Sequence, residues 1–430
     1  AGRNVDIRAL NYAQAGTARL EAAGNLKIDA GDAILIAGEM FAATATFDAV
    51  KKVVNVGEII ASGDVEVVAG EVWNMRSDRR IDTFFATGGV ADGCFVYCFD
   101  LGSLQIAGSA NWTDRSYLVG HGGVVAAKNL TITSSTYDIN NSGVLVAAQS
   151  LLLDAKRTVT QQSLRAVNRA ANSGAFLKTD ITKAKSNTVA NKIAEMTGGT
   201  VRDIYNGVRN PLISGSRVYY GAKAHGIGSL TVKAGHHVQN LGGEFKSNGR
   251  VLLQTTSYDV NLRAHGRWSH NFSHADSVDV VAGRNINLAQ AHFKADARTL
   301  KLDARGGITA DQNSIDAATY RNLFIREMGA GFVNTFYIDT PGWVNIAARG
   351  TITGNRSITA ASLYMRSTHG EVNQNYATRT TGETKFVSAS TMRVANSESS
   401  AGNLVLQSTA GSIYIQGNAR AKAIDIDAEH

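Results

Sequence analysis

Seven of the ten histidines lie in one stretch of the chain, where they form the densest group of potential metal ligands. They are His225, His236, His237, His265, His270, His274 and His292. A transition-metal site needs three or four ligands at about 2.1 Å from one ion, whereas an acid-sensing patch needs only proximity. Histidine is also common at half-exposed loop positions. We interpret these residues as polar groups on an exposed flank, and we expect no metal and no cofactor.

Catalytic signatures are absent from the sequence. It contains no Gly-x-Ser-x-Gly elbow, no His-Glu-x-x-His and no P-loop. Enzymes that cleave polysaccharides need carboxylates or basic residues that converge on one groove. The acids that we expect on the surface are far apart in the chain, at Asp29, Glu66, Asp303 and Asp425. We therefore expect no catalytic residue and no enzyme, with a polysaccharide-active enzyme as the alternative.

The only two cysteines are Cys94 and Cys98. In a flat strand their Cα atoms would be about 13 Å apart, which is too far for a disulfide. In a looped segment they could form a bridge, and a single bridge in an otherwise cysteine-free chain fits an exported protein. The alternative is two free, half-buried thiols. A metal site is not expected, because two thiols lack further ligands nearby.

The basic charge is concentrated in residues 163–225. This stretch has ten Lys or Arg and three acids, so it accounts for the formal net charge of +7 of the whole chain. It is either a helical cap with solvated charges or a surface for a polyanion or a protein. We hypothesise recognition, through Arg165, Arg169, Lys178, Lys183, Lys185, Lys192, Arg202 and Arg209. Aromatic residues do not alternate with these charges, so we expect no nucleic acid.

A short phrase recurs along the chain and organises it. In residues 24–31, Leu26, Ile28 and Ala30 alternate with polar residues between two glycines, which is the pattern of a strand with one buried face. Copies are spaced by roughly 20 residues, a period typical of a solenoid. The spacing joins Leu130 to Leu151, Leu230 to Val251, Val278 to Leu300, Val344 to Leu363 and Leu404 to Ile424. Leu26, Val65 and Leu104 follow one another at about twice this period.

A copy cannot bury its apolar row alone, so each must stack on its neighbours. Roughly 20 residues at about 3.3 Å each suit one turn of a three-sided coil. The sequence therefore predicts an all-β fold, a right-handed parallel β-helix with a helical insertion and looped excursions. The chain lacks an apolar run long enough for a membrane span. It opens and stops within the repeat pattern, and we expect a piece of a longer exported polypeptide.

The breaks in the pattern define three regions. Residues 1–162 are β-helix turns with a cysteine-containing excursion at 71–101. Residues 163–225 are the basic helical insertion, with one helix starting at Thr179 or Asp180, a second at Thr200, and a short one over 163–171. Residues 226–430 are β-helix turns with an aromatic excursion at 311–341, in which 315–328 could be helical. Its candidate contact residues are Tyr320, Phe324 and Phe336.

The phrase at 24–31 and the copy at 280–288 resemble the repeat of filamentous haemagglutinin. So does the turn at 242–249 that precedes Val251. This resemblance implies membership of the large exoproteins of two-partner secretion in Gram-negative bacteria, which include adhesins and the stalks of contact-dependent growth-inhibition toxins. It implies a right-handed parallel β-helix, export through an outer-membrane transporter, and display at the cell surface.

The resulting hypothesis is a secreted, surface-displayed β-helical exoprotein that acts as a rigid stalk and adhesin in virulence or cell adhesion. Its excursions bind a cell-surface receptor or glycan. The repeats do not separate an adhesin from a growth-inhibition stalk. The alternative to adhesion and catalysis is a self-assembling surface filament or layer, in which copies associate end to end.

Overall fold

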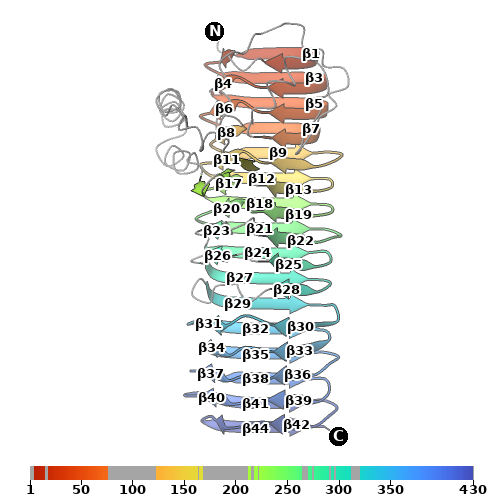
Figure 1. The fold of residues 1–430 in the computed structure, drawn as a ribbon, viewed down its shortest axis with the longest axis vertical. Coiled ribbons are helices and arrows are strands. Elements are labelled where there is room, and N and C mark those ends of the chain that lie inside the picture. Colours follow the sequence, from red (N-terminus) through yellow and green to blue (C-terminus); the bar gives the residue numbers. More distant parts are fainter. Residues whose placement is uncertain are drawn as a thin grey trace. The chain divides into compact units, whose positions relative to one another are not determined.

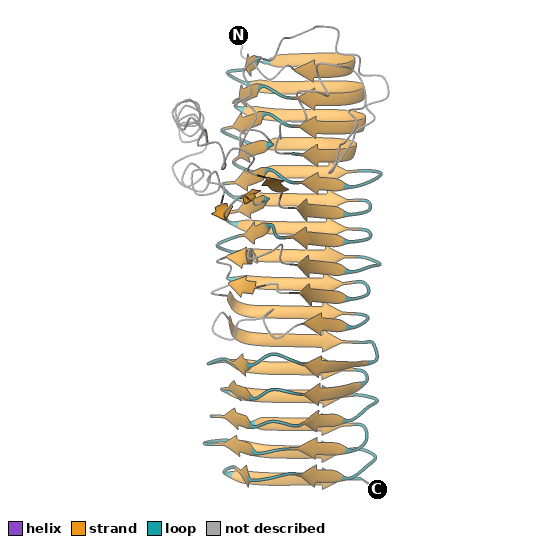
Figure 2. Cartoon of the chain, viewed as in Figure 1, coloured by secondary structure: helices purple, strands orange, loops and turns teal. Residues whose placement is uncertain are grey.

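The computed structural model describes residues 4–14, 18–75, 123–162, 164–167, 212–214, 217–220, 222–263, 270–273, 276–289, 292–294, 297–310 and 320–429. All regular elements among them are β-strands (Figure 2). In these ranges there is no helix with the length and apolar character to cross a membrane. The chain divides into two units, residues 1–227 and 228–430. Parallel strands stack turn upon turn in each unit (Figure 1), which confirms the predicted right-handed parallel β-helix.

Each turn of the β-helix contributes two or three strands, and each of these pairs in parallel with its counterpart in the next turn, whereas β14, β15 and β16 form a separate antiparallel sheet. The strands of unit 1 are β1 (Val5–Gln14), β2 (Arg19–Glu21), β3 (Asn25–Ile36), β4 (Glu39–Ala42), β5 (Thr44–Asn55), β6 (Glu58–Ala61), β7 (Val65–Asn74), β8 (Val124–Ala127), β9 (Leu130–Ser134), β10 (Ile139–Asn141), β11 (Val144–Ala147), β12 (Ser150–Ala155), β13 (Val159–Gln162), β14 (Leu164–Val167), β15 (Leu212–Ser214), β16 (Arg217–Tyr220) and β17 (Lys223–Gly226).

Unit 2 continues the same scheme in its own turns. Its strands are β18 (Ser229–Ala234), β19 (Val238–Leu241), β20 (Glu244–Lys246), β21 (Arg250–Thr255), β22 (Val260–Arg263), β23 (His270–Ser273), β24 (Ser277–Ala282), β25 (Ile286–Ala289), β26 (His292–Lys294), β27 (Ala297–Ala304), β28 (Ile308–Ala310), β29 (Tyr320–Glu327), β30 (Gly331–Asn334), β31 (Ile338–Asp339), β32 (Trp343–Ala348), β33 (Thr351–Gly354), β34 (Ile358–Ala360), β35 (Ser362–Ser367), β36 (Val372–Gln374), β37 (Thr378–Thr380), β38 (Thr384–Ser388), β39 (Met392–Val394), β40 (Ser397–Ser399), β41 (Asn403–Ser408), β42 (Ile413–Ile415), β43 (Ala419–Arg420) and β44 (Ala423–Ala428).

The strand register confirms the repeat spacing read from the sequence. The five predicted partners are paired directly: Leu130 with Leu151, Leu230 with Val251, Val278 with Leu300, Val344 with Leu363, and Leu404 with Ile424. Leu26 and Val65 are two turns apart, with Ala45 between them. Aliphatic side chains recur at the same place in successive turns, so they stack into columns in the interior of each unit.

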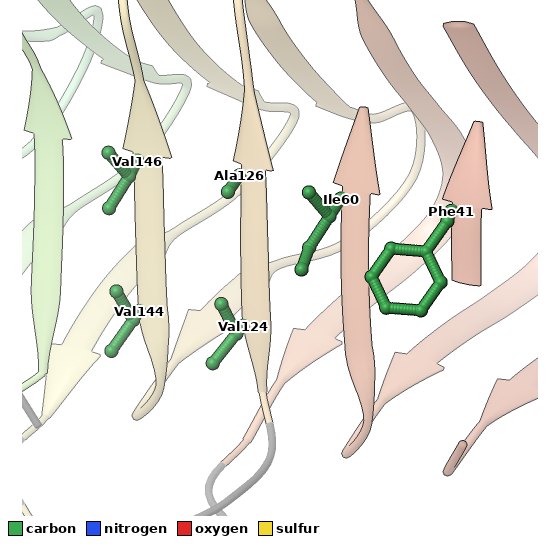
Figure 3. Packing of buried hydrophobic residues seen from close by; sticks show 6 residues of the cluster. All are labelled: Phe41, Ile60, Val124, Ala126, Val144 and Val146. Carbon is green, nitrogen blue, oxygen red and sulfur yellow. The ribbon is translucent and has the colours of Figure 1, made fainter. Parts of the chain in front are cut away.

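One sheet of unit 1 buries both of its faces. In β4, β6, β8 and β11, Met40, Ile59, Val125 and Leu145 alternate with a second row of buried residues. The second row forms a cluster on one side of these strands (Figure 3), made of Phe41, Ile60, Val124, Ala126, Val144 and Val146. The sheet thus contributes to two apolar layers, not to one.

A row of amide side chains runs through the interior of unit 1. Asn55 Nδ2 donates to Asn74 Oδ1 at 2.8 Å, Asn74 Nδ2 to Asn141 Oδ1 at 2.9 Å, and Asn141 Nδ2 to Gln161 Oε1 at 3.2 Å. These residues are buried at the ends of strands β5, β7, β10 and β13. The second amide hydrogens reach backbone carbonyls, among them Gly123 O at 2.7 Å from Asn74 Nδ2. The row therefore satisfies the polar groups of corners that are closed to water.

The first predicted excursion is wrong at its beginning. Residues 71–74 belong to β7, because Val72 keeps the alternation and fills the core. Val65 pairs with Leu130 in the next turn and Leu130 pairs with Leu151, so the place predicted for Leu104, two turns after Val65, is occupied by Leu151. Residues 76–122, including Cys94, Cys98 and Leu104, lie outside the described residues. Gly123 has φ of 61°, and a Cβ there would lie 2.4 Å from the backbone of Met75, so the chain returns beside the point where it left.

The predicted aromatic excursion at 311–341 is wrong for most of its length. Residues 320–327 form β29, which pairs with β27 and β32, so the predicted helix at 315–328 is wrong from Tyr320 onward. β30 and β31 then complete an ordinary turn. The apolar residues of β29 and β30 alternate with period two, and Tyr320, Phe332 and Phe336 fill the core instead of interrupting it. Residues 311–319 lie outside the described residues.

The ends of the basic insertion form strands. β14, β16 and β15 make a small antiparallel sheet, so the short helix predicted over 163–171 is wrong for residues 164–167. The antiparallel partners Val167 and Arg217 lie near the two ends of the insertion. Lys223 already belongs to β17, which pairs with β11 in the β-helix. The helices predicted to start at Thr179 or Asp180 and at Thr200 lie outside the described residues.

In each unit, a Tyr-Asp pair at a corner of the β-helix contacts an arginine of the following turn and accepts hydrogen bonds from that turn. The pairs are Tyr258 with Asp259, and Tyr137 with Asp138. Asp259 accepts two hydrogen bonds from Arg284, at 2.8 and 2.7 Å, and one from the Asn285 N–H at 2.9 Å. The Arg284 guanidinium lies 5.1 Å from the ring of Tyr258. In unit 1, Asp138 accepts from the Thr158 N–H at 2.9 Å, and Arg157 lies 5.9 Å from the Tyr137 ring.

We expect Asp259→Asn to lower the thermal midpoint of unit 2 slightly at neutral pH. The hydrogen bond from Arg284 lowers the pKa of Asp259, as does the Asn285 N–H. A carboxyl whose folded pKa is depressed adds stability above its unfolded pKa, and that stability is lost as the pH falls through the folded pKa. The difference between variant and parent should therefore shrink in acid. Melting curves of both proteins from neutral to acidic pH test this prediction. A difference in thermal midpoint that does not change with pH would contradict it.

Candidate binding surface

The outer face of five neighbouring strands in unit 2 carries the exposed Trp343 and the half-buried Phe324 and Tyr364 together with positively charged side chains. The strands are β27, β29, β32, β35 and β38, stacked in successive turns (Figure 1). We call this surface the aromatic–basic face and define it by Lys301, Phe324, Arg326, Trp343, Tyr364, Arg366 and Lys385. Its side chains are held by the strand alternation, because their neighbours in the chain fill the core.

One column of the face is symmetric about β32. The parallel register places Lys301, Phe324, Asn345, Tyr364 and Lys385 one above another. Each end of the column is a lysine, and the two aromatic rings are separated by a single Asn345. The Lys301 ammonium lies 5.6 Å from the centre of the Phe324 ring. Trp343 stands beside this column and is 40% exposed.

The neighbouring column carries two guanidinium groups. Its register is Asp303, Arg326, Ala347, Arg366 and Val387. Arg326 and Arg366 are thus two turns apart, as are Phe324 and Tyr364, and the turn between them carries the smaller side chains Asn345 and Ala347. Phe324 and Tyr364 therefore each have an arginine beside them. At the equivalent positions of the turn between these two pairs, the side chains are smaller and project less far from the sheet.

Arg326 is oriented by a buried acid. Its Nε and one terminal nitrogen donate to the two carboxylate oxygens of Asp303 at 2.8 and 2.6 Å. The Asp303 side chain is 8% exposed, whereas the Arg326 side chain is 52% exposed. Asp303 also lies 3.4 Å from the Lys301 ammonium. The expectation that Asp303 is a solvated surface acid is therefore wrong, because two cations cover it.

The remaining basic groups of the face are not neutralised. No acidic side chain in the described part of the chain pairs with Arg366 or Lys385. Asp303 offsets one of the four positive charges on Lys301, Arg326, Arg366 and Lys385. The exposed Glu383 lies at the edge of the face, two residues before Lys385 in the chain. An excess of positive charge beside exposed rings suits an anionic ligand that also has apolar faces.

The aromatic contact residues predicted from the sequence divide between surface and core. Phe324 lies on the aromatic–basic face. Tyr320 is 4% exposed and Phe336 is 1% exposed, so neither can contact a partner, and the prediction is wrong for both. Arg165 is in β14. The other predicted contact residues lie outside the described residues: Arg169, Lys178, Lys183, Lys185, Lys192, Arg202 and Arg209.

The histidines do not gather at one point in the described ranges. His225 is buried in β17, while His236 and His237 place their rings beside Tyr258, with centres 5.0 and 5.1 Å away. His270 and His292 occupy neighbouring positions in β23 and β26. His265 and His274 lie outside the described residues. No group of three His, Cys, Asp or Glu side chains among the described residues is placed to hold a metal.

The sequence analysis missed Lys301, Arg326, Trp343, Tyr364, Arg366 and Lys385, although a signal was present for some of them. The phrases Leu323-Phe324-Ile325-Arg326 and Leu363-Tyr364-Met365-Arg366 share an aromatic residue followed two positions later by arginine. In a strand both of these positions point outward. Once the turn length is known, the two phrases must lie two turns apart on one face.

Comparison with known proteins finds no family model, no curated protein and no solved structure that matches this chain.

Proposed function

We propose that the protein is a surface-displayed β-helical exoprotein of the filamentous-haemagglutinin type, and that it acts as a stalk and adhesin which binds an acidic glycan. The repeat phrases and the parallel β-helix support this class of protein. Export through an outer-membrane transporter and display on a Gram-negative cell belong to the same proposal. The basic insertion at 163–225 stays a predicted second contact region.

The aromatic–basic face is the observation that carries the binding function. Aromatic rings pack against the apolar faces of sugar rings, and guanidinium groups bind carboxylates and sulfates with oriented hydrogen bonds. Hydrogen bonds to the neighbouring turns hold these strands, and so the binding side chains, at fixed distances. This favours binding because the protein loses little conformational entropy when the ligand binds. A stalk function is consistent with the same feature, since strand pairing and stacked core residues resist bending.

We expect Arg366→Glu to weaken binding to an acidic polysaccharide. Losing one charge-assisted hydrogen bond and adding a repulsive charge should lower affinity at least about tenfold. Arg379→Glu is the matched control, because Arg379 is exposed on β37 in another sheet of unit 2. Calorimetric titration of both variants with a soluble acidic polysaccharide provides the measurement. Equal loss in both variants, or no binding by the parent protein, would contradict the proposal. Binding should also weaken with added salt.

A further inference from the structure

The aromatic–basic face repeats its chemistry with a period of two turns. Phe324 and Arg326 project from β29, and Tyr364 and Arg366 project from β35 in the same register. Neighbouring strands are about 4.8 Å apart, so the two pairs are separated by about 9.6 Å along the stacking direction. This separation is close to the length of one disaccharide in an extended β-linked polysaccharide.

The turn between the two pairs has different chemistry. β32 presents Asn345 and Ala347 at the equivalent positions, with neither a ring nor a charge. In these two columns the chemistry alternates: ring and cation, then small polar and small apolar, then ring and cation again, while Trp343 lies beside them on β32. A ligand that matches it must alternate in the same way, with an anionic unit followed by an uncharged one.

The two cations are held in different ways. Asp303 fixes the plane of Arg326 by two hydrogen bonds and leaves part of the guanidinium exposed. Arg366 has no acidic partner among the described residues, so its guanidinium is available to a ligand. Lys301 and Lys385 extend the positive charge beyond both ends of the aromatic column.

We infer that this face binds a linear polysaccharide with one carboxylate or sulfate in each disaccharide, lying along the stacking direction with one disaccharide for every two turns. The inference rests on the proposed function and specifies its ligand. Each anionic sugar lies at an arginine, and a sugar ring packs on Phe324 or Tyr364. The uncharged sugar lies over Asn345 and Ala347, whose side chains are smaller than those of the two aromatic–arginine pairs.

Two probe series of matched length test the periodicity. One consists of hyaluronan oligosaccharides, which carry a carboxylate on every second sugar, and the other of oligogalacturonates, which carry one on every sugar. Titration calorimetry with the full chain should show roughly tenfold tighter binding of the alternating series. Its affinity should rise with length until the chain spans both arginines, and then level off.

A double variant changes the spacing without changing the charge. Ala347→Arg combined with Arg366→Ala moves the second guanidinium from two turns to one turn away from Arg326. We expect this variant to lose the preference for the alternating series and to bind oligogalacturonates at least as well as the parent does. Circular dichroism and melting curves would show whether the variant keeps the β-helix. If it does not, the single variants Arg366→Ala and Tyr364→Ala should each weaken binding of the alternating series.

The outcomes separate this inference from the function on which it rests. Equal affinity of the parent for both series would overturn the periodic match but leave an acidic-glycan adhesin. Binding of neither series, or equal binding of polyglutamate, would overturn both. A preference that survives in the double variant would also overturn the periodic match, because the spacing of the two arginines would then not determine it.

Discussion

Asn74→Ala should destabilise unit 1 by about 3 kcal/mol, because it removes three buried hydrogen bonds from the amide row. Asn74 accepts from Asn55 Nδ2 and donates to Asn141 Oδ1 and to Gly123 O. The alanine has no polar atom to offer these partners, and the side chain at this position is 3% exposed, so water does not replace it. A loss of this size is a large fraction of the stability of an ordinary domain.

Asn140→Ala is the matched control for this prediction. Asn140 precedes Asn141 in β10 and points to the other side of the strand. Denaturant unfolding of both variants gives the comparison, and amide hydrogen exchange in β7 and β10 localises the effect, because a repeat protein need not unfold in one step. Equal stability of the Asn74 and Asn140 variants would show that the amide row does not hold the turns together.

Glu327→Gln should stabilise unit 2 at neutral pH and have little effect in acid. Glu327 is fully buried at the last inward position of β29, where the neighbouring turns carry Ala304 and Ala348. Its Oε1 accepts from the Gly331 N–H at 3.4 Å, while Oε2 is buried without a hydrogen-bond partner. Burial raises the pKa of Glu327, and hydrogen bonds from Gly331 and Gly329 oppose this only in part.

The sign of the pH dependence follows from the raised pKa. Burial disfavours the ionised form in the folded state, so Glu327 costs stability above its ordinary pKa of 4.5, increasingly up to the folded pKa. The cost is about 1.4 kcal/mol for each unit by which the pKa is raised. The stabilisation by Gln should therefore grow with pH over this window and then stay constant. Melting curves of both proteins from acid to mildly basic pH test it, and a Gln variant that is less stable throughout would refute it.

The repeat carried most of the information about the fold. The alternation around Leu130 and Leu151 specified strands, and their spacing specified the partner in the next turn, because a solenoid bonds each copy only to its neighbours. Long interruptions were harder to place. Val65 and Leu104 have a plausible spacing, yet Val65 pairs with Leu130, since a turn can be prolonged at a corner without any change in its strands.

The candidate surface was only partly predictable. The aromatic residues at 320–337 suggested a break in the pattern, but Tyr320 and Phe336 are buried in the core of ordinary turns. The aromatic–basic face combines residues from five turns, and only the register brings them together. The pairing of the buried Asp303 with Arg326 likewise depends on two strands that are distant in the sequence.

Because the backbones of Met75 and Gly123 adjoin, the segment between them could be replaced by protein engineering. Residues 76–122 depart and come back at adjoining backbone positions, while β6 and β7 bond to β8 and β9 as if nothing intervened. Replacing residues 76–122 with a foreign domain whose termini are adjacent would leave the pairing of the flanking strands unchanged. This corner is therefore a suitable site for inserting another domain, because β6, β7, β8 and β9 would keep their present pairing.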